Sequence, residues 1–146
     1  MIKQIIAFFN SEPEAAQPEL SVDDAAAVLL IEIMMADHDM DQRERQSIES
    51  ILSKRLNATE SEIKECIDVA IKRREASHDT YQFTKVINDH WGEQQRYELV
   101  VDLWRVAFAD GELDKHEDQR VRRLNESLHL HHSHFIKAKA EAQNNP

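Results

Sequence analysis

Residues 36–44 read ADHDMDQRE, and residues 109–117 read ADGELDKHE. Alanine, two aspartates and the final glutamate recur at matching places in the two stretches. The fourth position is acidic in both, as Asp39 and Glu112, and the fifth is apolar, as Met40 and Leu113. The copies lie 73 residues apart, and each follows an apolar run and precedes a helix-like pattern. The repeat therefore marks two joints, each between a buried helix and an amphipathic one.

The helices on either side of these joints also correspond. Apolar residues cover nearly all faces of the expected helices at 22–36 and 93–109, which predicts that both are central and lie beside each other in the core. After the joints, Ile48 and Ile51 match Val121 and Leu124 at the same offset of 73. The pattern therefore predicts a duplicated helix–loop–helix unit.

The rest of the chain also favours helix. It has 146 residues, enough for one domain with a real core, and only two glycines and three prolines. Apolar stripes at helical spacing predict further helices near the N-terminus, after Thr59, after Asp79 and after Ser133. We expect an all-α bundle of seven to eight helices, with the pseudo-duplicated unit around the two central helices. Residues 1–20 are expected to form an amphipathic helix and linker, and residues 21–146 the helical domain.

The first expected helix has two interpretations. Its apolar stripe consists of Ile2, Ile5, Ile6 and Phe9. The stripe could pack on the domain, or it could dock on a partner or a membrane surface. Lys3 is its one cation, which is little charge for attraction to anionic lipid.

Two side chains on later stripes could be mistaken for functional groups. Cys66 lies on the apolar stripe of the helix after Thr59, so we expect a small core residue rather than a reactive thiol. His90 continues the stripe of the following helix, and we expect a hydrogen-bonded core histidine there rather than a ligand.

The charge excludes some classes of protein. With 18 basic and 28 acidic residues the net charge is −10, which argues against nucleic acid as a partner. No apolar run is long enough to cross a bilayer, and the N-terminus has no convincing signal-peptide cleavage site, so we expect no membrane insertion. The single cysteine fits a reducing compartment. These features predict a cytoplasmic protein.

The acidic stretches carry the clearest chemistry. Alternating acids in a turn, with a glutamate one helical turn later, can direct several oxygens at one point, and Ca²⁺ takes six to eight oxygen ligands. Capping of the following helices explains the last aspartate and the glutamate of each copy. It does not explain Asp37, Asp39, Asp110 and Glu112. The candidate metal ligands are Asp37, Asp39, Asp41, Glu44, Asp110, Glu112, Asp114 and Glu117.

Other metal sites and catalytic sites have weaker support. An EF-hand loop needs glycine at its sixth position, where this chain has Gln42 and Lys115. A di-iron bundle needs Glu-x-x-His motifs at helix spacing, and Glu126 to His129, on a late helix, is a poor match to that pattern. A histidine cluster could bind a transition metal adventitiously; it consists of His129, His131, His132 and His134. A hydrolase using the carboxylates is a weaker alternative. We expect no catalytic residues and no organic cofactor.

The segment FADGELD at 108–114, with the related stretch at 36–44, resembles the TerB-like family of tellurite-resistance-associated helical domains. The likeness covers roughly residues 20–142. In the first copy His38 stands where the second has Gly111, so the two loops differ there. The resemblance implies an all-helical domain with a metal site at the eight acids named above. It also implies association with tellurite resistance, stress response and membrane-linked systems, and no defined catalytic activity.

Together these observations predict a non-enzymatic, cytoplasmic domain that binds Ca²⁺ or another divalent cation at its paired acidic loops. Its other partner would be a protein of a stress-response or membrane-linked complex. The alternative is a metal-independent interaction module whose acidic face docks on a basic partner. The sequence leaves the ion, the partner and the oligomeric state open.

Overall fold

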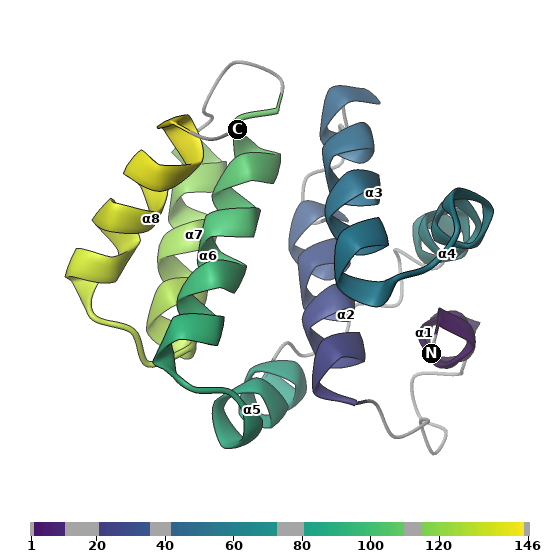
Figure 1. Ribbon diagram of the computed structural model, residues 1–146, viewed down its shortest axis with the longest axis horizontal. Coiled ribbons are helices and arrows are strands. Elements are labelled where there is room, and N and C mark those ends of the chain that lie inside the picture. The colour runs from purple at the N-terminus through teal and green to yellow at the C-terminus, as the bar shows by residue number, and fades with distance from the viewer. Residues whose placement is uncertain (1, 11–20, 36–41, 73–80, 110–114, 145–146) are drawn as a thin grey trace.

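The computed structural model describes residues 2–10, 21–35, 42–72, 81–109 and 115–144. These residues form eight α-helices and no strand, so the predicted all-α class is confirmed. The helices pack as a bundle, with α8 at one end of its longest axis and α4 and α1 at the other (Figure 1). Their bounds are α1 Ile2–Asn10, α2 Val22–Met35, α3 Gln42–Leu56, α4 Glu60–Lys72, α5 Tyr81–His90, α6 Glu93–Ala107, α7 Lys115–Ser127 and α8 His132–Asn144.

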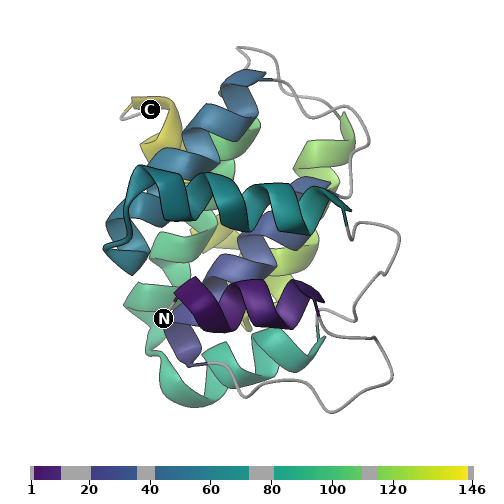
Figure 2. The ribbon, with the colours of Figure 1, turned by 90° about the vertical axis from the view of Figure 1, so that its right-hand side faces the viewer.

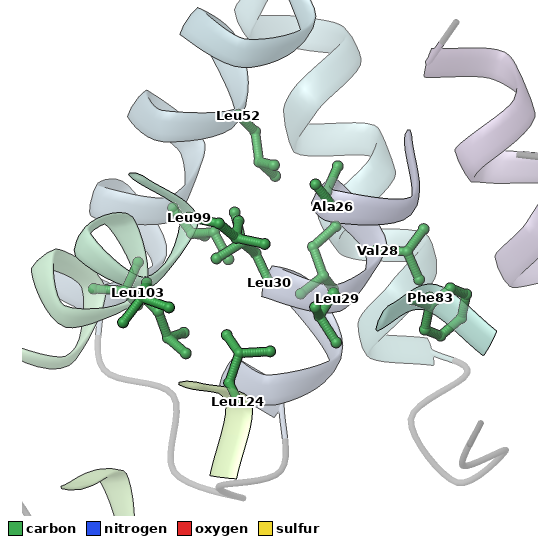
Figure 3. Close-up of a cluster of buried hydrophobic side chains, with 14 of the residues drawn as sticks. Ala26, Val28, Leu29, Leu30, Leu52, Phe83, Leu99, Leu103 and Leu124 are labelled. Carbon is green, nitrogen blue, oxygen red and sulfur yellow. The ribbon is translucent and has the colours of Figure 1, made fainter. Parts of the chain in front are cut away.

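The two helices predicted to be central supply most of the core. Every residue of α2 from Ala25 to Ile31 has 0% of its surface exposed. Helix α6 buries eight of its residues and contacts α2. In Figure 3, Leu30 of α2 lies among leucines of the neighbouring helices, including Leu52 of α3 and Leu99 of α6. The nearly all-round apolar pattern of both segments is explained by neighbours on several sides.

Helix α1 packs on the domain, which decides between the two interpretations of the N-terminal stripe. It lies between α4 and α5 across the first turns of α2 (Figure 2). Ile5, Phe8 and Phe9 are buried, and the Phe8 ring meets Phe83 of α5 edge to face at 5.4 Å between centroids. Phe8 was not part of the predicted stripe. Its burial follows because α1 contacts other helices on more than one side.

The connection from α3 to α4 is short and locally stabilised. Asn57 ends α3 with φ of 51°, a left-handed conformation that asparagine tolerates. Thr59 and Glu62 then form a capping box: the Glu62 N–H donates to Thr59 Oγ1 at 3.2 Å, and the Thr59 N–H donates to Glu62 Oε1 at 3.1 Å. The backbone and hydroxyl hydrogen bonds from Thr59 lower the pKa of Glu62. The predicted boundary between these helices is therefore confirmed.

The predictions for Cys66 and His90 had different outcomes. Cys66 is fully buried on α4, as predicted, and desolvation raises the pKa of its thiol to about 12. The prediction that His90 lies in the core is wrong. His90 is exposed on the last turn of α5, with its Nδ1 2.9 Å from the Val86 carbonyl oxygen. At the end of a helix the ring can hydrogen-bond to the backbone while still facing solvent.

Two expectations about chain organisation remain predictions. Helices α3 and α7 begin at Gln42 and Lys115, at the 73-residue spacing of the sequence pattern, but the helix bounds alone do not establish a duplication. The proposed linker at 11–20 lies outside the described residues, and the boundary at residue 20 is untested. Among the described helices, none combines the length and apolar character needed to cross a bilayer.

Candidate functional site: the joints between the central and flanking helices

The four helix ends that flank the two acidic stretches point toward the same end of the bundle. The last turns of α2 and α6 and the first turns of α3 and α7 all lie toward the upper end in Figure 1. The chain therefore leaves and re-enters the helical body at the same end in both copies. Six of the eight predicted ligands lie outside the described residues: Asp37, Asp39, Asp41, Asp110, Glu112 and Asp114.

The remaining two predicted ligands begin the flanking helices. Glu44 lies in the first turn of α3 and is only 5% exposed. A buried carboxylate requires hydrogen-bond donors or a cation, and the helix N-terminus supplies part of that stabilisation. Glu117 lies in α7, but its side chain is outside the described part of the structure. The predicted capping by Asp41 and Asp114 is likewise outside it.

The chain entering the second acidic stretch is fixed by aromatic packing. Phe108 follows α6, and its ring stacks on Trp104 at 5.5 Å between centroids with 18° between planes. The Phe108 N–H donates to the Trp104 carbonyl at 2.9 Å, and the Ala109 N–H donates to the Val106 carbonyl at 3.1 Å. These bonds tighten the end of α6 and set the direction in which the chain leaves it.

An ion-pair network holds α3 against α6 below the joints. Asp102 of α6 accepts from Arg55 of α3, with Nε to Oδ2 at 2.8 Å, and from Arg105, with Nη1 to Oδ1 at 2.9 Å. The Asp102 side chain is only 14% exposed. This ion-pair network was not predicted from the sequence. An acidic residue inside the apolar run of α6 nevertheless indicates that a cation lies opposite it.

The histidine cluster does not act as one site. His134 Nε2 lies 2.7 Å from Glu93 Oε1, while the His131 ring lies 3.0 Å from the Ser133 hydroxyl. The His132 ring instead stacks on Phe135. Throughout the described residues, no three His, Cys, Asp or Glu side chains are arranged to hold a metal ion.

Among the described residues, Tyr97 and Asp24 are acidic groups with displaced pKa values, and both lie away from the joints. The Tyr97 hydroxyl donates to Glu141 Oε2, and desolvation, with that acidic neighbour, raises the pKa of Tyr97 to about 12. Asp24, in the first turn of α2, is completely buried. Within the described residues, neither of its carboxylate oxygens has a well-aligned hydrogen-bond partner, and desolvation raises its pKa. The nearby Ser21 hydroxyl offsets only part of that effect.

Replacing Asp24 with asparagine is expected to raise the free energy of unfolding at neutral pH by about 1 kcal/mol, because a buried, unpartnered carboxylate is costly. The raised pKa means that the folded chain binds this proton more tightly than the unfolded chain, whose value is 3.8. Wild-type stability therefore falls relative to the variant as pH rises above 3.8 toward the folded pKa. Urea unfolding between about pH 4 and pH 8 measures this difference.

The neighbouring Asp23 is the matched control, since it is exposed in the same helical turn. Asp23→Asn is expected to change stability little. A gain for Asp24→Asn that stays constant or shrinks with rising pH would contradict the assigned cause.

The described helices define a class of protein: an all-helical domain in which the helix ends that flank the two acidic stretches of the sequence lie toward the same end of the bundle. A family model described as tellurite resistance protein TerB matches residues 23–140. The chain belongs to the TerB family, and the resemblance noted in the sequence is confirmed. Neither the curated proteins nor the solved structures contain a match to this chain.

Proposed function

We propose that this chain is a non-enzymatic, cytoplasmic member of the TerB family that binds Ca²⁺ or a similar divalent cation with the carboxylates of its two acidic stretches. Its role would lie in tellurite resistance or a related stress response, through a protein partner. The bound ion would tie the end of α2–α3 to the end of α6–α7. The observation that carries the proposal is that these four helix ends all lie toward the same end of the bundle in Figure 1.

Two further features support it. The four acids that capping leaves unexplained belong to the segments that join these helix ends, and carboxylates brought near one another there would favour a cation that neutralises them. The start of the second joint is also anchored by the stacked rings of Trp104 and Phe108, and the Asp102 network holds the far end of α3 against α6. Anchored ends lower the entropy lost when a loop closes on an ion.

The non-enzymatic part of the proposal rests on the polar groups of the described surface. One hollow, of about 740 Å³, is lined by residues of α4 in the described part of the chain, and another, of about 420 Å³, lies between α5 and the end of α7. Asp24, Cys66 and Tyr97, whose pKa values are raised, line neither of them. Active sites usually combine a pocket with such perturbed groups.

Titration of metal-stripped protein with Ca²⁺ tests the proposal. Calorimetry should show saturable binding by about 1 mM Ca²⁺, in the range of sensor and extracellular sites, and the melting temperature should rise with the ion. Asp37→Asn combined with Asp110→Asn should abolish both signals, since it removes one unexplained acid from each stretch. Mg²⁺ in parallel shows whether the site selects the larger ion.

A control for lost charge uses Glu98→Gln combined with Glu126→Gln, two exposed carboxylates on α6 and α7 outside the acidic stretches. This variant should bind Ca²⁺ as tightly as the wild-type chain does. Absence of heat and of any melting shift at millimolar Ca²⁺ would defeat the proposal. An equal loss of Ca²⁺ binding in both double variants would mean that binding depends only on the overall negative charge of the chain.

A further inference from the structure

Asp24 is a buried carboxylate in the part of α2 that α1 crosses. It lies in the first turn of α2, and none of its surface is exposed. Val28, one turn further along the same face, points toward Phe83 of α5 (Figure 3), and the Phe83 ring in turn meets Phe8 of α1. On α4, the Cys66 thiol is close enough for the Asp24 charge to act on it. Asp24 is therefore enclosed where α1, α2, α4 and α5 come together (Figure 2).

An apolar stripe holds α1 on this part of the bundle. Ile5, Phe8 and Phe9 are at most 3% exposed, and the helix packs on α4, α2 and α5. A helix of nine residues is not stable alone in water, so α1 keeps its helical hydrogen bonds only while this stripe is docked. The backbone amides of α1 therefore become open to exchange with solvent whenever the helix undocks.

The protonated and ionised forms of Asp24 favour different states of this contact. Among the residues that the structure describes, neither carboxylate oxygen has a well-aligned hydrogen-bond partner, so burial penalises the charged form. With α1 docked, desolvation raises the pKa of Asp24 above its ordinary value of 3.8. With α1 undocked, water reaches the carboxylate and the pKa returns toward that value. Undocking is therefore linked to the loss of a proton, and rising pH favours it.

We propose that α1 is a releasable helix and that ionisation of Asp24 promotes its release as pH rises. Release exposes the Phe83 ring and apolar surface of α4. Above pH 3.8 the equilibrium constant for release should rise by up to about tenfold per pH unit, and it should level off above the pKa of the docked state. Below pH 3.8 the carboxyl group is protonated in both states, and the pH dependence disappears.

Other charged groups around Asp24 do not produce this pH dependence. The charge of the neighbouring Asp23 raises the pKa of Asp24, and the amino terminus of the chain lowers it but loses its own charge only near about pH 8. On α4, Glu62 is attracted by Lys3 of α1, so protonation of Glu62 weakens docking in acid, which is the opposite direction. The Cys66 thiol, with a pKa of about 12, stays neutral. The described titratable residues of α5 are all exposed: Tyr81, Lys85, Asp89 and His90.

Amide hydrogen exchange of the full chain, followed residue by residue by NMR, tests the proposal. After correction for the intrinsic pH dependence of exchange, the protection of α1 amides should fall as pH rises from about 4 to 7. Amides of α6 should be at least about tenfold better protected throughout, because α1 opens without global unfolding. Protection of α1 amides that equals that of α6 amides, or that does not change with pH, overturns the proposal.

Asp24→Asn removes the ionisation from the buried position. At pH 7 this substitution should raise the protection of α1 amides by about fivefold or more, and the difference from wild type should disappear toward pH 4. The matched control is Asp23→Asn, in the same turn but exposed, which should change the protection little. An Asp24→Asn variant with unchanged protection at pH 7, or with an equal gain at pH 4, overturns the proposal.

Two ring deletions distinguish local release from global unfolding. Phe8→Ala removes the α1 ring that meets Phe83 and should lower the protection of α1 amides by about tenfold or more. Phe135→Ala removes a similarly buried ring from α8, at the other end of the bundle (Figure 1), and should leave the protection of α1 amides unchanged. Equal decreases in the two variants would mean that α1 opens only when the whole chain unfolds, and would overturn the proposal.

Discussion

Replacing Trp104 with alanine is expected to lower the free energy of unfolding by about 3–5 kcal/mol, the loss typical of a fully buried aromatic side chain. Trp104 has no exposed surface and lies between the rings of Phe108, at 5.5 Å, and Phe135, at 5.2 Å. It therefore joins α6, α8 and the chain leading into the second acidic stretch. Urea unfolding followed by circular dichroism measures the loss.

Two matched substitutions test the assigned cause. Trp104→Phe should recover most of the stability, because the buried indole Nε1 has no hydrogen-bond partner among the described residues and phenylalanine keeps the ring contacts. Trp91→Ala should lower the free energy of unfolding by less than half as much as Trp104→Ala does. Trp91 is only half-buried, under the Arg55 guanidinium. Equal losses for Trp91→Ala and Trp104→Ala would show that ring burial in the core does not set the cost.

Asp102→Asn is expected to lower the free energy of unfolding by about 2 kcal/mol, since the substitution removes the negative charge between two guanidinium groups in a largely buried position. The Arg55 side chain is 20% exposed and that of Arg105 is 32% exposed, so water replaces the lost charge only partly. Because this network joins α3 to α6, the loss should appear in the global unfolding transition. Equilibrium unfolding in urea measures it.

The same substitution at Asp68 is the control. Asp68 pairs with Arg45 at 2.7 Å, a separation as short as those in the Asp102 network, but its side chain is 57% exposed. Asp68→Asn should cost less than about 1 kcal/mol, and added salt should reduce that difference. Equal losses at the two positions would mean that burial of the ion pair does not determine its contribution.

Helical periodicity predicted the fold well where one helix face is buried. The stripe of α4 and the capping box at Thr59 are local patterns, and both are present in the structure. Periodicity was less informative where tertiary neighbours decide burial. Phe8 is buried because α1 has neighbours on two sides, and His90 is exposed because α5 ends there. The apolar stripe of one helix does not show how many neighbours that helix has or where it ends.

The candidate site was predicted only in part. The sequence located the joints, and the flanking helices lie where it placed them, with Glu44 buried at the start of α3. The Asp102 network was not predicted, because its partner Arg55 is 47 residues away and such a pairing depends on how α3 crosses α6. Most of the candidate ligands fall outside the described residues, so their role as ligands is a prediction for the Ca²⁺ titration.

The buried position of Cys66 has a consequence for covalent chemistry on this chain. With a pKa of about 12, roughly one thiol in 100,000 is ionised at neutral pH, and only the thiolate reacts with alkylating or oxidising reagents. Cys66 is also completely buried, so a reagent reaches it only when the helices around it separate. The rate at which this one natural thiol becomes labelled reports how often the folded chain opens between α4 and its neighbours, with no engineered probe.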